Sequence, residues 1–338
     1  MLQRFLFAKK GQICYYKIMN FITPTKTKTI IFFVVAVLVV GLLMIVGTFF
    51  DLQISREMTK NSLKAGEYYT NDFFAVLGEA FGSMPIWIAM CIASCLTAFC
   101  VAKTKKSKWY KVIFCTLFAL LAIFVSFYCV KEVFEYLFEY RNPDFLESSF
   151  ARWLTVAFSF LIFGAIAFLC RKCNPSPKTW RFIVVVVCSC ALFVLIETIK
   201  INFGRVRFRA INFLQDESLF SPWYVVNGKR TVEGLNIDAC KSFPSGHTFS
   251  AGIFSLIVCL SDFFDRFKKK CVVILLWSAS IGFTACVGLS RIVAGAHFLT
   301  DVTVGGALSF FGVVFFREAF LHKFANFKVF SKTEIKNV

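Results

Sequence analysis

The sequence lacks the patterns that mark several classes of protein. It shows no internal repeat and no low-complexity segment, so a repeat architecture is not expected. Its lone C-x-x-C pair, Cys170 and Cys173, has no second pair and no nearby histidine, which argues against a zinc site. No A-x-A-like cleavage site follows the first apolar run, so we expect this run to remain as a helix and not to be removed as a signal peptide.

Charged residues are scarce, at 17% of the chain, whereas apolar residues make up 58%. This is more apolar than an ordinary soluble domain. Apolar runs of about 15 to 22 residues recur, which is the length at which a helix crosses a bilayer. We therefore predict an all-α fold, a polytopic transmembrane helical bundle of about eight spans. The spans are expected at about 29–50, 84–102, 112–130, 153–170, 182–199, 245–261, 271–289 and 297–316.

Acidic residues number 20 against 38 lysines and arginines, and the formal net charge of +18 raises the question of nucleic-acid binding. The distribution of the cations argues against it. If the N-terminus is cytoplasmic, most of them fall on the cytoplasmic side of the predicted spans, as the positive-inside rule requires. We therefore expect no nucleic-acid partner, a multi-pass protein of the plasma membrane, and both termini in the cytoplasm.

This topology divides the chain into four expected segments. They are a cytoplasmic N-terminal segment (1–28), the N-terminal spans (29–180), a transmembrane core that carries three distinctive stretches (181–316) and a cytoplasmic tail (317–338).

Two amphipathic stretches also predict helices that lie in the membrane interface. One is the polar segment 51–83 with its tyrosines and phenylalanines, and the other is the tail. In the tail, the phenylalanines recur at helical spacing: Phe316, Phe320, Phe324 and Phe327.

The first distinctive stretch opens the loop 200–244, which is predicted outside although its cations outnumber its acids. Cations on this side of the membrane suggest an anionic ligand. Lys200, Arg205 and Arg207, with Gly204 between them, could fold around one phosphate. The alternative is that these basic side chains only extend to the interface at a helix end.

The second stretch, 241–248, opens the sixth predicted span. Ser245 is a good N-cap, Gly246 lets a ligand approach the backbone, and the first N–H groups of a helix attract anions. His247 at this helix end could protonate a leaving oxygen. The plainer alternative is a capped helix with a polar histidine at the interface.

The third stretch, 290–301, contains a cation, an imidazole and a carboxylate. The guanidinium of Arg291 is a fork of donors suited to an oxyanion. His297 and Asp301 are four residues apart, so on a helix they share a face, and the carboxylate would fix the tautomer of the imidazole. A structural His–Asp pair is the alternative, but ionisable residues at a membrane span are functional candidates by default.

The three stretches are stronger evidence for a functional site together than any one of them is alone. The chain has only three histidines, and His247 and His297 lie in these stretches on the same predicted membrane face. Two imidazoles, several cations and a helix N-terminus suit covalent phosphoryl transfer. The outer acids are scattered and form no evident metal cage, so we predict no metal and no cofactor.

The stretches resemble those of the type 2 phosphatidic acid phosphatase family, the lipid phosphate phosphatases related to vanadium haloperoxidases. The family pattern is K-x6-R-P, then P-S-G-H, then S-R-x5-H-x3-D. The spacing is matched by Lys200 and Arg207, by Pro244 to His247, and by Ser290, Arg291, His297 and Asp301. Phe208 stands where the family usually has Pro. The resemblance covers about 182–316, and eight spans exceed the family's usual six-helix core.

The resemblance implies a role for each matching residue. His297 would be the nucleophile that forms a phosphohistidine, oriented by Asp301, and His247 the general acid for the leaving alcohol. The phosphate ligands would be Lys200, Arg207, Ser245, Gly246 and Arg291, with Arg205 close enough to assist.

The implied reaction is metal-independent hydrolysis of a phosphorylated membrane lipid at the extracytoplasmic face. Phosphatidic acid, phosphatidylglycerophosphate and undecaprenyl pyrophosphate are the candidate substrates. Two alternatives remain open from the sequence: a phosphotransferase that uses the same site, and a non-catalytic protein that binds or transports anionic lipids.

Overall fold

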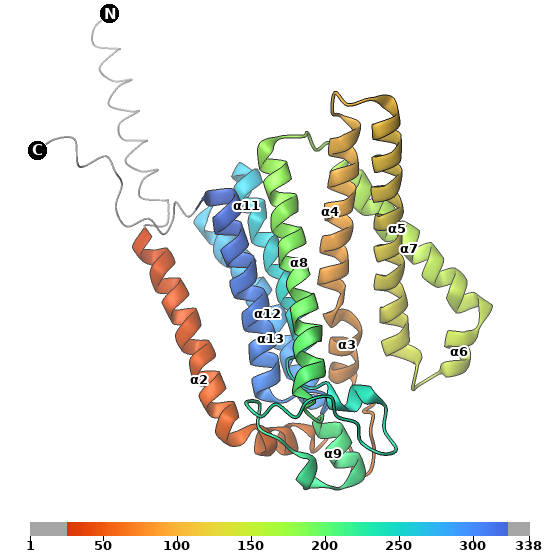
Figure 1. Ribbon diagram of the computed structural model, residues 1–338, viewed down its shortest axis with the longest axis vertical. Coiled ribbons are helices and arrows are strands. Elements are labelled where there is room, and N and C mark those ends of the chain that lie inside the picture. The colour runs from red at the N-terminus through yellow and green to blue at the C-terminus, as the bar shows by residue number, and fades with distance from the viewer. Residues whose placement is uncertain (1–25, 324–338) are drawn as a thin grey trace, which may run out of the picture.

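The structure is a computed structural model that describes residues 26–323 of the 338-residue chain. Every regular element in this range is a helix, and the long helices form a bundle (Figure 1). Eight helical segments are long and apolar enough to cross a membrane: Ile31–Thr59, Phe73–Ala102, Lys108–Phe138, Ser149–Cys170, Pro177–Leu214, Gly246–Phe263, Lys270–Val293 and Leu299–His322. The predicted all-helical, multi-pass fold is confirmed.

The N-terminal half of the bundle is built from helices whose starts are fixed by polar caps. Asp72, Ser107, Asn142 and Ser148 each accept a hydrogen bond from a backbone N–H in the first turn of the helix that follows. The helices of this half are α2 (Lys26–Thr59), α3 (Phe73–Gly82), α4 (Met84–Ala102), α5 (Lys108–Phe138), α6 (Pro143–Glu147) and α7 (Ser149–Cys170).

In the C-terminal half, two short helices adjoin the first two distinctive stretches: α9 follows the first stretch, and α10 begins within the second. The α-helices of this half are α8 (Pro177–Phe203), α9 (Phe208–Leu214), α10 (Gly246–Gly252), α11 (Leu260–Phe263), α12 (Lys270–Val293) and α13 (Leu299–Phe316). Short helical segments of other types lie at Glu217–Leu219, Ile237–Cys240, Ile253–Cys259, Asp265–Phe267 and Arg317–His322.

The apolar side chains divide between a protein core and an outer surface. The largest core cluster joins α4, α5, α8, α10 and α13, with Phe249 and Ile196 fully buried in it. In contrast, α2 presents large apolar side chains outward, such as Leu38 (65% exposed) and Phe49 (73%). Lipid tails are as apolar as these side chains, so the exposed surface suits a bilayer.

Successive connections lie at alternate ends of the bundle. The connections 103–107, 171–176 and 264–269 lie at the end near α11, whereas 204–245 and 294–298 lie at the opposite end beside α9 (Figure 1). The assignment of cytoplasmic and outer loops from their positive charge requires this alternation. Which end faces the cytoplasm stays a prediction.

Two predictions about helix boundaries in the spans are wrong. The segment 51–83 is not one separate helix: α2 runs on to Thr59, where polar residues such as Asp51 (3% exposed) are buried against the protein, and α3 begins at Phe73. The helix α3 then meets α4 across Ser83 as part of the bundle. The last span begins at Leu299 and not at His297, because Gly295 has a φ of +64° and interrupts the helical path.

The described part of the tail also differs from its prediction. Arg317–His322 continues α13 as a π-helical turn, and Phe316 and Phe320 pack against the core cluster instead of lying on a membrane surface. The predicted positions Phe324 and Phe327, like the basic segment before residue 26, lie outside the described residues.

Candidate active site

The three stretches meet at the α9 end of the bundle. The amide of Ser245 donates to the carbonyl of Asp301 at 3.0 Å. The carbonyl of Ser242 lies 2.6 Å from Nδ1 of His297. A Cβ on Gly246 would lie 2.7 Å from Nζ of Lys200, so only glycine permits this approach. Residues far apart in the sequence thus form one polar cluster.

His297 lies in the loop before α13 and is 1% exposed. Its Nδ1 is 2.6 Å from the Ser242 carbonyl oxygen but 3.7 Å from Oδ2 of Asp301. A carbonyl oxygen only accepts, so Nδ1 carries the hydrogen and Nε2 keeps its lone pair. The argument from two residues on one helix face is therefore wrong: His297 precedes the helix, and a backbone carbonyl is its nearest partner.

Burial is the main cause that lowers the pKa of His297 to about 3. The positive charges of Arg207 and Arg291 act in the same direction, and Asp301 opposes them. The imidazole is consequently neutral near pH 7, which is the state a nucleophilic nitrogen requires.

Asp301 occupies the first turn of α13 and is fully buried. Its Oδ2 accepts from the Phe298 amide at 2.8 Å and from the hydroxyl of Ser242. It therefore holds both the loop that carries His297 and the residue whose carbonyl orients the imidazole. If Asp301 orients His297 as predicted, it does so mainly through Ser242, which bonds to Asp301 through its hydroxyl and contacts the imidazole through its carbonyl.

Arg205 is fully buried and is bonded on several sides. Its guanidinium donates to Oδ2 of Asp51 at 2.9 Å, to the carbonyl of Ser221 at 2.8 Å, and to the carboxylate of Asp301. Its centre also lies 4.1 Å from the ring centroid of Phe298. These contacts favour a positioning role for Arg205 over the predicted assistance to phosphate binding.

Lys200 and Arg207 flank the turn after α8. Nζ of Lys200 lies 2.7 Å from Oε1 of Glu197, one turn earlier in α8. Arg207 donates from Nε to the carbonyl of Asp238 at 2.9 Å, and its Nη2 is 3.6 Å from that carboxylate. Both cations are almost fully buried, at 9% and 7% exposed.

Several buried nitrogen atoms at the site have no hydrogen-bond partner within the described part of the chain. They are Nε and Nη1 of Arg291, Nε of Arg209 and Nε2 of His247. The His247 ring also packs edge-on against Tyr136, with centroids 5.0 Å apart. A buried polar group without a partner costs about 1–3 kcal/mol, so these atoms are suited to bind the oxygen atoms of water or of an anionic ligand.

The second stretch is capped as predicted. Ser245 is the N-cap of α10, and its hydroxyl accepts from the Thr248 amide at 3.3 Å. Phe208, which stands in the family's Pro position, is the first residue of α9. The backbone N–H of the first helical residue has no partner within the helix, so Pro is well accepted there. Phe in place of Pro therefore requires no different backbone path.

Four residues at the site were missed by the sequence argument. Ser242 lies two residues before the P-S-G-H run, Asp51 lies on α2, Glu79 lies on α3, and Arg209 lies two residues after Arg207. In the sequence, Asp51 and Glu79 could have been recognised only as acidic residues next to predicted spans, where ionisable side chains are candidates for a function.

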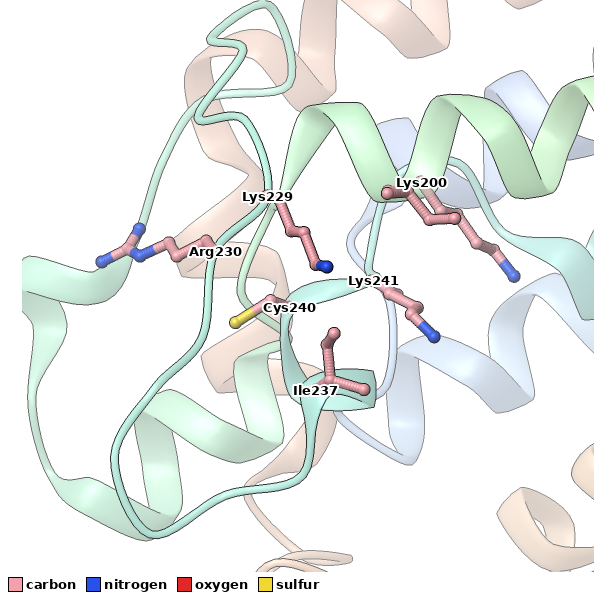
Figure 2. A pocket seen from close by; sticks show the side chains of 8 residues that line it. Lys200, Lys229, Arg230, Ile237, Cys240 and Lys241 are labelled. Atoms are coloured by element: carbon pink, nitrogen blue, oxygen red, sulfur yellow. The ribbon is translucent and has the colours of Figure 1, made fainter.

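A small basic hollow, partly open to solvent, adjoins the site. Lys200, Lys229, Lys241, Ile237 and Cys240 line it (Figure 2). Lys241 is the neighbour of Ser242 in the chain, so the hollow lies directly beside the residue that orients His297.

The structure thus combines a helical bundle apolar enough to span a membrane with a buried imidazole that lies among arginines and lysines. Residues 182–324 match the family model of the PAP2 superfamily, and this match supports a phosphatase of the PAP2 type. The resemblance found in the three stretches is confirmed, and the match suggests phosphatase-type activity on phosphorylated substrates. Comparisons with curated proteins and with solved structures found no match.

Proposed function

We propose that this protein is an integral membrane phosphatase that hydrolyses a lipid phosphate or lipid pyrophosphate at the extracytoplasmic face. The observation that carries the proposal is the state of His297. Its Nδ1 lies 2.6 Å from a carbonyl oxygen, which leaves the Nε2 lone pair available, and Arg207 and Arg291 are close enough to lower its pKa. A neutral nucleophile surrounded by cations suits attack on a phosphate dianion.

In the first step, Nε2 of His297 attacks phosphorus and the bond from phosphorus to the lipid oxygen breaks. His247 donates a proton to that leaving oxygen, which departs as an alcohol or as a lipid monophosphate. Arg207 and Arg291, with Lys200, stabilise the charge on the non-bridging oxygens, and the Gly246 amide adds a donor beside Ser245.

In the second step, His247 takes a proton from water, and the water oxygen attacks the phosphohistidine. The bond between phosphorus and Nε2 breaks, which releases inorganic phosphate and restores neutral His297. Asp301 keeps the loop in place during both steps through its bonds to the Phe298 amide and to Ser242.

Metal independence is part of the proposal. Within residues 26–323, no three His, Cys, Asp or Glu side chains are grouped so that they could hold a metal ion. The cations of the site would supply the charge stabilisation that metal ions supply in other phosphoryl-transfer enzymes.

The test is phosphate release by the purified protein in detergent, with EDTA present, from phosphatidic acid, phosphatidylglycerophosphate and undecaprenyl pyrophosphate. We expect release by the wild type, loss of at least about a thousandfold in His297→Ala, and retained release in His322→Gln, which changes the histidine at the opposite end of the bundle. Activity that survives in His297→Ala would refute the mechanism. Transfer of the phosphoryl group to an added alcohol, without free phosphate, would identify a phosphotransferase.

A further inference from the structure

Each cation assigned to the phosphate is already paired with a carboxylate from outside the family pattern. The pairs are Lys200 with Glu197, Arg207 with Asp238, and Arg291 with Glu79. The third pair is the most buried: the Arg291 side chain is fully buried and that of Glu79 is 16% exposed, against 42% for Glu197 and 57% for Asp238. Glu79 also lies outside residues 182–324, which match the superfamily.

The position of Glu79 is set by close packing of α3 on α12. A Cβ on Gly78 would lie 1.8 Å from the hydroxyl oxygen of Ser290, and a Cβ on Gly82 would lie 2.8 Å from the Val287 side chain. These two glycines are one turn apart, so α3 approaches the third stretch closely along one face. Glu79 lies between these two glycines in the sequence, so the packing of α3 on α12 fixes the place of its carboxylate at the site.

Glu79 contacts two arginines at once. Its Oε1 is 2.8 Å from Nη2 of Arg291 and 3.8 Å from Nη1 of Arg209. The remaining nitrogen atoms of Arg291, Nε and Nη1, are buried and have no partner among residues 26–323. The Glu79 carboxylate thus already occupies one donor of the Arg291 guanidinium, which is the proposed phosphate ligand. Two other donors of this guanidinium have no acceptor among the described residues.

We propose that Glu79 is an internal competitor for the phosphate site, which weakens the binding of phosphate to Arg291 and Arg209 and so promotes release of inorganic phosphate after hydrolysis. This inference rests on the proposed function. The physical basis is that the arginine donors are shared between two anions, and that the carboxylate repels a phosphate dianion held beside it. It also gives a role to α3, one of the helices beyond the superfamily region.

A purely structural role for Glu79 predicts the opposite effect. If the carboxylate only holds Arg291 in place, its removal would loosen the guanidinium and weaken phosphate binding. Competition predicts stronger binding after removal, so the sign of the change distinguishes the two roles.

The experiment is calorimetric titration of the purified full-length protein with inorganic phosphate, which requires no turnover. In Glu79→Gln, the neutral amide still offers an oxygen to Arg291 but no charge, and we expect the Kd for phosphate to fall by about tenfold or more. Glu132→Gln is the matched control, because this acid lies on α5 and bonds to the indole of Trp87 and not to an arginine. Its Kd should stay within about twofold of the wild type. Glu79→Asp, which retracts the charge, should give an intermediate Kd.

An unchanged or higher Kd in Glu79→Gln, in protein that elutes as a folded species, overturns the inference. So does a similar decrease in Glu132→Gln, since this would reflect net charge alone. The outcomes separate from those of the phosphatase assay. Phosphate release with an unchanged Kd rejects only the role of Glu79, whereas a lower Kd without any release keeps that role and rejects the hydrolase.

Discussion

Asp51 of α2 gives the strongest prediction about stability, because it holds a buried arginine from another part of the chain. Its Oδ2 is 2.9 Å from Nη2 of Arg205, and its Oδ1 accepts from the Thr300 amide at 3.1 Å. Asp51 is 3% exposed and Arg205 is fully buried. No water can replace the carboxylate without a rearrangement of the packing.

Asp51→Ala removes both acceptors and leaves buried donors without partners. Removal of one member of a buried ion pair costs about 3–5 kcal/mol. Arg205 keeps its bond to Asp301, so we expect the lower end of this range, about 3 kcal/mol. Asp51→Asn retains an acceptor for Arg205 and should cost less. In both variants kcat should fall, because Arg205 also positions Asp301.

The assay is denaturant titration in mixed micelles, followed by the reaction of a thiol dye with cysteines that are buried in the fold, such as Cys91 and Cys129. Asp144→Ala, which changes an exposed aspartate on α6, is the control and should leave the unfolding midpoint unchanged. A loss of less than about 1 kcal/mol in Asp51→Ala would show that the pair with Arg205 contributes little.

Four further predictions concern the site. The labelled imidazole signal of His297, assigned by its loss in His297→Ala, should not titrate between about pH 5 and 8, because its pKa is lowered to about 3; a midpoint near 6.5 would contradict the assignment. The unfolded chain binds this proton below about 6.5 and the folded chain does not, so the free energy of unfolding should decrease as the pH falls from 6.5 toward 3. Phe208→Pro should keep kcat within about threefold, because Pro suits the first residue of a helix; a loss of activity without unfolding would refute this. Lys229→Glu combined with Arg230→Glu should raise KM about tenfold at low salt and less at high salt, with kcat unchanged, if the hollow attracts an anionic head group.

The sequence was sufficient to predict the spans and the cluster of stretches, because both depend on patterns that are local in the chain. Apolar runs of membrane length predict helices directly. The capping role of Ser245 was predictable for the same reason, since an N-cap depends on the residues that follow it within one turn.

The partner of His297 was not predictable, because it is a backbone carbonyl, which every residue possesses. The spacing to Asp301 suggested a helical pair, but Gly295 ends the helical path and places His297 in a loop. The carbonyl of Ser242 then lies closer than the carboxylate. Side-chain patterns cannot reveal such a contact, which depends on how two loops pack.

The two acids Asp51 and Glu79 change the interpretation of the N-terminal spans. Each lies on a helix outside residues 182–324, and each pairs with an arginine of the motif region, Arg205 or Arg291. A helix present only to anchor the protein in lipid would have no need to bury a carboxylate at the α9 end of the bundle, because a buried charge is costly unless it is paired. The added helices therefore contribute to the charge balance of the site, and a fragment limited to the superfamily region should lack the carboxylates of Asp51 and Glu79 that pair with these two arginines.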